Sequence, residues 1–143
     1  MDEFWVSAGY SHRDSIELCL VGEPRRVKEA NVYGCLHFLD AYVALKPMFQ
    51  NTPVHEWQLP RGTAHEILIL KEVILKAQSL WIPPYTDFEL CHCRVIQTQV
   101  VDRAIIFGAH SSETVARLTS AGTGCGTCKP DIERMISHRL TEG

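Results

Sequence analysis

The sequence has no long apolar run, no basic run and no internal repeat, and each absence argues against a class of protein. A membrane-spanning helix needs about 20 consecutive apolar residues, and no such stretch is present. A charged segment followed by an apolar secretion signal is also missing, so we expect a cytoplasmic protein with no membrane partner. The formal net charge of −3, without any lysine- or arginine-rich run, argues against nucleic acid as a partner.

Enzyme signatures are missing as well. The sequence contains no phosphate-binding glycine loop after a predicted strand and no G-x-S-x-G nucleophile motif. His65-Glu66 begins like the zinc motif H-E-x-x-H, but Ile69 stands where the second histidine is needed. We therefore predict a binding protein that is not an enzyme.

The last third of the chain, in contrast, contains cysteines in two closely spaced pairs. Cys91 and Cys93 form a C-x-C pair, and Cys125 and Cys128 form a C-x-x-C pair. Four thiolates, two on each iron, are the ligands of a [2Fe–2S] cluster. Glycines around the second pair leave the backbone free to curl around such a cluster. The expected cofactor is therefore a [2Fe–2S] cluster bound by these four cysteines.

Zinc is the main alternative for the four cysteines. Zinc ribbons usually present two C-x-x-C knuckles on hairpins, whereas the residues between these two pairs have helical periodicity. Structural disulfides are disfavoured in a reducing cytosol. A sixth cysteine, Cys19, alternates with apolar residues in a predicted strand and is expected to be a packed side chain.

The fold predicted from periodicity is α+β, with a small antiparallel sheet and packed helices followed by a small all-α domain. Strands are expected around residues 4–6, 16–21 and 27–33. Helices are expected at 36–45, which is apolar on nearly all sides and limited by Pro47, and at 63–81, which begins with a capping box and stops at Pro83. Three further helices are expected at 98–107, 112–119 and 130–140. The predicted domains are residues 1–83 and 91–143, joined by a linker over 84–90.

The stretch from Cys91 to Ile136 closely resembles the bacterioferritin-associated ferredoxin domain, which also occurs within NifU proteins and assimilatory nitrite reductases. All four cysteines match the [2Fe–2S] ligands of that family, and the strings AI-x-x-GA, T-x-AG and GCGTCKP are matched too. The resemblance implies a helical [2Fe–2S] domain.

Three strings in the first half are similar to the IscU/NifU N-terminal scaffold domain, on which iron–sulfur clusters are assembled. His12-Arg13-Asp14 stands where that family has Cys-Gly-Asp, Tyr33-Gly34-Cys35 where it has Tyr/Phe-Gly-Cys, and His65-Glu66 where it has His-Cys. Two of the three cluster-building cysteines are thus replaced, and neither imidazole nor carboxylate can carry a persulfide. The resemblance therefore implies a degenerate scaffold domain.

Two interpretations of this second site stay open. In the first, a zinc or ferrous ion is bound by a mixed set of nitrogen, oxygen and sulfur ligands. Its ligands would be His12, Asp14, Cys35, His65 and Glu66. In the second, these side chains do not meet. Glu66 closes the capping box on Thr63, His65 lies in the first turn of that helix, His12 and Asp14 are solvated in a turn, and Cys35 is buried at a helix start.

Together the two resemblances imply a NifU-like [2Fe–2S] protein that acts in iron–sulfur cluster assembly or iron handling. Its expected partners are iron–sulfur assembly proteins or redox proteins. The alternative is a ferredoxin-like electron carrier, or a redox or iron sensor, with the N-terminal domain as a docking module. A homodimer is left open.

Overall fold

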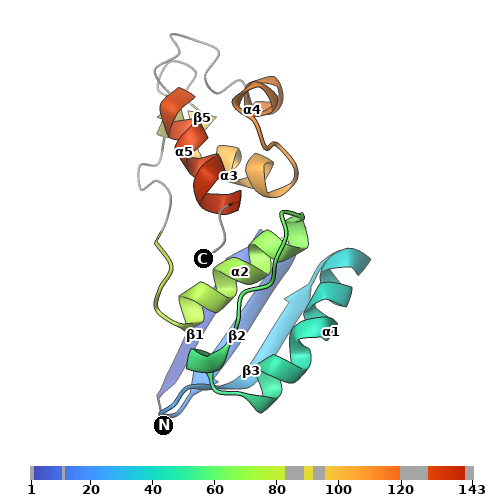
Figure 1. The fold of residues 1–143 in the computed structure, drawn as a ribbon, viewed down its shortest axis with the longest axis vertical. Helices are drawn as coiled ribbons and strands as arrows, with labels where there is room; N and C mark the ends of the chain where they lie inside the picture. Colours follow the sequence, from blue (N-terminus) through green and yellow to red (C-terminus); the bar gives the residue numbers. More distant parts are fainter. Residues whose placement is uncertain (1, 11, 83–88, 92–95, 120–128, 141–143) are drawn as a thin grey trace. The chain divides into compact units, whose positions relative to one another are not determined.

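The fold is α+β, as the sequence predicts (Figure 1). The chain divides into two compact units, residues 1–81 and residues 82–142, which we name the N-terminal unit and the C-terminal unit. This computed structural model describes residues 2–10, 12–82, 89–91, 96–119 and 129–140. Only the backbone is described for residues 89–91, 96–97 and 129.

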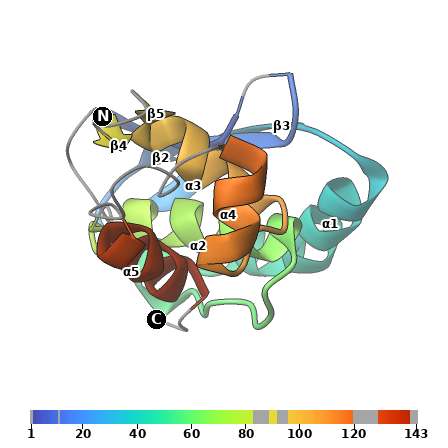
Figure 2. The same cartoon turned by 90° about the horizontal axis from the view of Figure 1, so that it is seen from above.

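Three antiparallel strands form the sheet of the N-terminal unit, in the order β1-β2-β3. The strands are β1 (Glu3–Gly9), β2 (Ser15–Val21) and β3 (Arg26–Tyr33). Val6 lies opposite Leu18 and Ala8 lies opposite Ile16, and all four side chains are buried. Because side chains alternate between the faces of a sheet, this register gathers the apolar residues on one face. Helices α1 and α2 lie against one face of the sheet in both views (Figures 1 and 2).

Helix α1 (Leu36–Asn51) is longer and more exposed than the sequence predicts. Pro47 does not end the helix but lies inside it. A proline removes the hydrogen bond to the carbonyl four residues earlier, which here belongs to Val43. Val43 is 61% exposed, so the lost hydrogen bond falls in a part of the helix that faces solvent.

The sequence of this helix, apolar on nearly all sides, suits a buried helix, but the helix is only partly buried. Phe38 and Phe49 are buried, whereas Leu36, Leu39 and Val43 are exposed. The helix thus contributes one narrow apolar stripe to the core and leaves a second one in solvent.

Helix α2 (His65–Ala77) ends earlier than the sequence predicts. Ser79 adopts a φ of 61°, and the backbone N–H groups of Ser79 and Leu80 donate to carbonyls in the last turn at 3.1 and 2.8 Å. This is the hydrogen-bond pattern of a Schellman motif, which closes a helix at a residue in the left-handed conformation. The helix therefore ends before Pro83, the residue predicted to stop it.

The C-terminal unit contains three helices at the predicted places, each within one residue at either end. They are α3 (Thr98–Ile106), α4 (Ser112–Thr119) and α5 (Lys129–Leu140). A short antiparallel pair, β4 (Glu89–Cys91) and β5 (Ile96–Gln97), adds to the predicted all-α domain. The apolar faces of the helices form one core, made of Val101, Ile105, Ala109, Val115, Ile132, Met135 and Ile136. Among the described residues, every helix falls short of the length and apolar character that a membrane crossing requires.

Candidate metal centre

Asp14 closes the turn between β1 and β2. The backbone N–H of Tyr10 donates to the Asp14 carbonyl at 2.9 Å, and the Arg13 N–H donates to the Tyr10 carbonyl at 3.1 Å. Gly9 permits this close approach, because a Cβ atom there would lie 2.1 Å from the Asp14 carbonyl oxygen. Asp14 is only 4% exposed, so it is not the solvated turn residue of the second interpretation.

Cys35 is the N-cap residue of α1. Its backbone N–H donates to Asp14 Oδ1 at 2.7 Å, so the Asp14 carboxylate lies at the positive end of the helix, where negative charge is favoured. Gly34 leaves room for this contact, because a Cβ atom there would lie 2.3 Å from Asp14 Oδ1. Cys35 is exposed, which contradicts the prediction of a buried helix-start residue.

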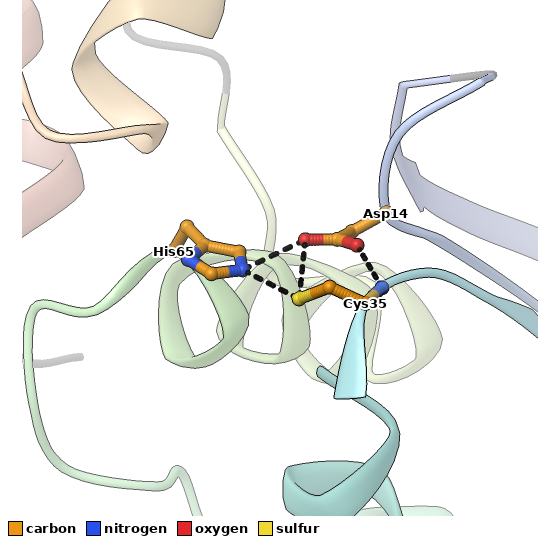
Figure 3. A group of neighbouring side chains, drawn as sticks. All are labelled: Asp14, Cys35 and His65. Carbon is orange, nitrogen blue, oxygen red and sulfur yellow. Dashed lines mark hydrogen bonds and ion pairs between the residues drawn. The ribbon is translucent and has the colours of Figure 1, made fainter. Parts of the chain in front are cut away.

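His65 is the first residue of α2, and its Nε2 atom faces the other two side chains (Figure 3). Nε2 lies 2.8 Å from Asp14 Oδ2 and 3.3 Å from Cys35 Sγ. Cys35 Sγ lies 3.6 Å from Asp14 Oδ2. One ligand atom from each residue thus falls within 4.8 Å of the others, and the three come from three separate elements of the fold.

The spacing of these atoms suits a tetrahedral metal ion. With bonds of about 2.0–2.3 Å, the ligand atoms of tetrahedral zinc lie about 3.3–3.8 Å apart. The separations from Cys35 Sγ, 3.3 Å to His65 and 3.6 Å to Asp14, already fall in that range. The 2.8 Å contact between His65 and Asp14 is a hydrogen-bond distance and would widen by about half an ångström around zinc.

The same geometry argues against a nucleophile relay. In a catalytic triad, one ring nitrogen of the histidine faces the nucleophile and the other faces the carboxylate. Here Cys35 and Asp14 both face Nε2 of His65. Convergence on a single nitrogen is typical of ligands around a shared ion, with the imidazole bound through one nitrogen.

The other two predicted ligands, His12 and Glu66, lie outside this group of three. His12 is exposed and has a φ of 68°. Glu66 Oε1 lies 4.0 Å from Nδ1 of His65, on the far side of the ring from Nε2. The N-cap of α2 is Ala64 and no side chain bonds it, so the predicted capping box between Thr63 and Glu66 is wrong.

Sequence reasoning named the three converging residues but missed what positions them. The hydrogen bond from the Cys35 N–H to Asp14 was not predicted, nor were the close approaches at Gly9 and Gly34. The signals in the sequence are two glycines, Gly34 directly before Cys35 and Gly9 before the turn that contains Asp14.

The four predicted cluster cysteines belong to the C-terminal unit. Cys91 is the last residue of β4, and Cys93, Cys125 and Cys128 lie outside the described residues. Helices α3 and α4 separate the two pairs along the chain, and α5 begins directly after Cys128. Two pairs of thiolates separated by helices fit a [2Fe–2S] cluster, whose irons each take two cysteines.

Comparison with known families supports the same cofactor. Residues 90–138 match the sequence model of the BFD-like [2Fe-2S] binding domain, a range that contains both cysteine pairs. No curated protein and no solved structure matches the chain. The similarity of the N-terminal unit to the IscU/NifU scaffold stays a prediction, as does the assignment of individual ligands. The chain is a [2Fe–2S] cluster-binding protein whose cluster domain occupies residues 90–138.

Proposed function

We propose that this [2Fe–2S] protein acts in iron–sulfur cluster assembly or iron handling, as a NifU-like protein without enzymatic activity. In this proposal the C-terminal unit holds a stable cluster. The N-terminal unit holds a single zinc or ferrous ion and does not build a cluster.

The observation that carries the proposal is the convergence of Asp14, Cys35 and His65 in a chain that also holds a [2Fe–2S] domain. Nitrogen, oxygen and sulfur ligands together suit zinc or ferrous iron. A single thiolate is too few to hold a [2Fe–2S] cluster, which takes four protein ligands, of which at least two are cysteines even in Rieske centres. The group is therefore suited to one ion, and three protein ligands leave one coordination position for exchange.

The exposure of Cys35 supports a role that involves partner proteins. The Asp14 carboxylate is buried and fixed by a backbone hydrogen bond, whereas the thiol can be reached from solvent. An iron–sulfur assembly protein or a redox protein with ligands of its own would approach the ion from the Cys35 side.

An electron carrier with the N-terminal unit as a docking module is the second candidate. The exposed apolar side chains of Tyr33, Leu36 and Val43 favour it, because such residues suit contact with a redox partner protein. In that case the group around Cys35 would not exchange its metal with other proteins.

Transfer to an apo-protein separates the two candidates. We would incubate the iron-loaded protein without oxygen with an apo-ferredoxin and added sulfide, and follow the iron that the apo-ferredoxin gains. The proposal predicts transfer by the wild type and slower transfer by Cys35→Ser. Reversible reduction and reoxidation with no transfer from either protein would contradict the proposal and favour the electron carrier.

A further inference from the structure

Glu66, the second residue of α2, has a buried carboxylate oxygen that the fold leaves unused. Within the part of the chain that the structure describes, Glu66 Oε2 is buried and has no hydrogen-bond partner. Ala64 is the N-cap and Glu66 is the second helical residue, so Glu66 does not stand at the third helical position from which a capping box is closed. Burying a carboxylate oxygen without a partner is costly, and such groups in folded proteins often mark a functional site.

The position of Glu66 relative to His65 suggests what the carboxylate does. Nε2 of His65 faces Asp14 and Cys35, so Nδ1 points away from them. Glu66 Oε1 lies 4.0 Å from that Nδ1. A hydrogen bond requires a separation of about 2.7–3.2 Å, so a shift of about 1 Å in the ring or the carboxylate would form it.

Metal binding supplies the reason for that shift. A histidine that binds a metal through Nε2 is neutral and carries its proton on Nδ1. Metal-bound histidines almost always donate this second N–H to a carboxylate, a carbonyl or water, which fixes both the tautomer and the ring orientation.

We propose that Glu66 is the positioning residue of the N-terminal site: it accepts the Nδ1–H hydrogen bond of His65 when the ion is bound, and it is not itself a ligand. This inference rests on the proposed metal site of Asp14, Cys35 and His65. It departs from the sequence-based prediction, in which Glu66 is one of the ligands.

A second His-Glu neighbour pair in the chain provides a matched control. His55 Nε2 lies 3.6 Å from Glu56 Oε2, a shorter separation than in the first pair. The two side chains are 66% and 58% exposed, against 24% and 15% for His65 and Glu66. Neither belongs to a group of metal-ligating side chains among the described residues. A variant of Glu56 therefore reports what loss of an adjacent carboxylate does away from the site.

The test compares Glu66→Leu, Glu66→Gln and Glu56→Gln in the full-length protein with its cluster intact. Zinc affinity is measured by competition with a chelator. The ligands of the bound ion are identified from the visible spectrum of added Co²⁺, after the cluster absorbance has been subtracted. Glu66→Leu should bind zinc about 10- to 100-fold more weakly, the usual cost of removing such a partner. Glu66→Gln should recover most of the affinity, because its amide oxygen accepts the same hydrogen bond. Glu56→Gln should match the wild type.

The Co²⁺ spectrum separates a positioning residue from a ligand. With Asp14, Cys35 and His65 intact, the sulfur-to-cobalt band should keep its energy in both Glu66 variants. A change in the energy of this band would show that Glu66 is a ligand and would overturn the inference. Equal zinc affinity in Glu66→Leu and wild type would also overturn it, because Glu66 would then have no effect on the site. If Glu66→Leu does not fold, the imidazole ¹⁵N spectrum of the zinc-loaded wild type decides: a proton on Nε2 of His65 would overturn it.

Failure of the underlying metal site gives a different result. If the wild type binds no more zinc or Co²⁺ than Cys35→Ser, the proposed N-terminal ion is wrong and the inference about Glu66 fails with it. If the wild type binds zinc and Cys35→Ser does not, a null result for Glu66→Leu rejects the role of Glu66 alone.

Discussion

The four cysteines of the C-terminal unit lie in two close pairs within one stretch of sequence, whereas Asp14, Cys35 and His65 come from a turn and the starts of two helices. The first set can be recognised from its spacing, and the match over residues 90–138 agrees with it. The second set becomes a candidate site only when the fold brings its atoms within 4.8 Å. Local spacing can thus identify a metal site directly, while a site built across elements needs the tertiary structure.

The largest effect should follow loss of a cluster cysteine. Replacing Cys125 or Cys128 by serine removes one thiolate from the predicted four, so the visible absorbance of the cluster should disappear. Replacing Cys35 by serine is the matched control, because that cysteine lies in the other unit and should leave the spectrum unchanged. If Cys125→Ser kept the visible absorbance of the wild type, Cys125 would not be a cluster ligand. The contrast between a site recognised from spacing and a site built by the fold would then fail.

The next largest effect should follow from weakening the buried ion pair of the C-terminal unit. Arg139 Nε and Nη2 donate to the two Asp102 carboxylate oxygens at 2.8 and 2.7 Å, with the side chains 5% and 15% exposed. Asp102→Asn leaves a buried arginine with a weaker partner and should lower the free energy of unfolding by about 3 kcal/mol. The cluster absorbance should then be lost at a lower denaturant concentration, with zinc binding in the N-terminal unit unchanged.

The exposed pair of the same unit provides the control for that change. Arg134 lies 3.1 Å from Asp131, with the side chains 63% and 25% exposed. Asp131→Asn should therefore lower the free energy of unfolding by less than about 1 kcal/mol. Equal effects of the two variants would contradict the role of burial in the Asp102–Arg139 pair. Loss of zinc binding in Asp102→Asn would show that the units do not behave independently.

Gly34→Ala tests the positioning of the N-terminal site. The new Cβ atom would lie 2.3 Å from Asp14 Oδ1 and 2.9 Å from Phe38 Cδ2, so the carboxylate must move. Overpacking of this kind costs about 1–3 kcal/mol, and zinc affinity should fall with it. Gly108→Ala is the control for backbone strain, since Gly108 also has a positive φ, 122°, but a Cβ atom there meets nothing within 4 Å. It should lower stability without changing zinc affinity. Wild-type zinc affinity in Gly34→Ala would show that the position of Asp14 does not matter.

The smallest effect concerns the reactivity of the two remaining thiols. Burial raises the pKa of the Cys19 thiol, and the side chain is 1% exposed, whereas Cys35 is exposed. Because the thiolate is the reactive form, iodoacetamide should label Cys35 and leave Cys19 unlabelled until the protein unfolds. Excess zinc should slow labelling of Cys35, as peptide mass spectrometry can follow. Rapid labelling of Cys19 in the folded protein would contradict its place in the core.

The strands and the C-terminal helices could be predicted because their apolar periodicity is local. Alternation around Ile16 and Leu18 marks a strand with one buried face, and the positions of α3, α4 and α5 follow from repeating apolar residues. The end of α2 could not be predicted, because a Schellman motif formed at Ser79 replaces the expected stop at Pro83.

The metal site was predictable as a set of residues but not as an arrangement. Asp14, Cys35 and His65 are far apart in sequence, and only the contact of the β1–β2 turn with the start of α1 brings the first two together. Glu66 shows the opposite error: its spacing from Thr63 suits a capping box, yet the N-cap is Ala64 and the carboxylate lies 4.0 Å from Nδ1 of His65. Short motifs have more than one meaning, and the surrounding fold selects among them.

The most direct test is a count of iron, acid-labile sulfide and zinc per chain, together with the visible spectrum, on wild type and Cys35→Ser purified without oxygen. The account predicts two irons and two sulfides in both proteins, with one additional zinc or iron in the wild type alone. Zinc without sulfide or colour would contradict the [2Fe–2S] assignment. Identical metal content in the two proteins would contradict the second site.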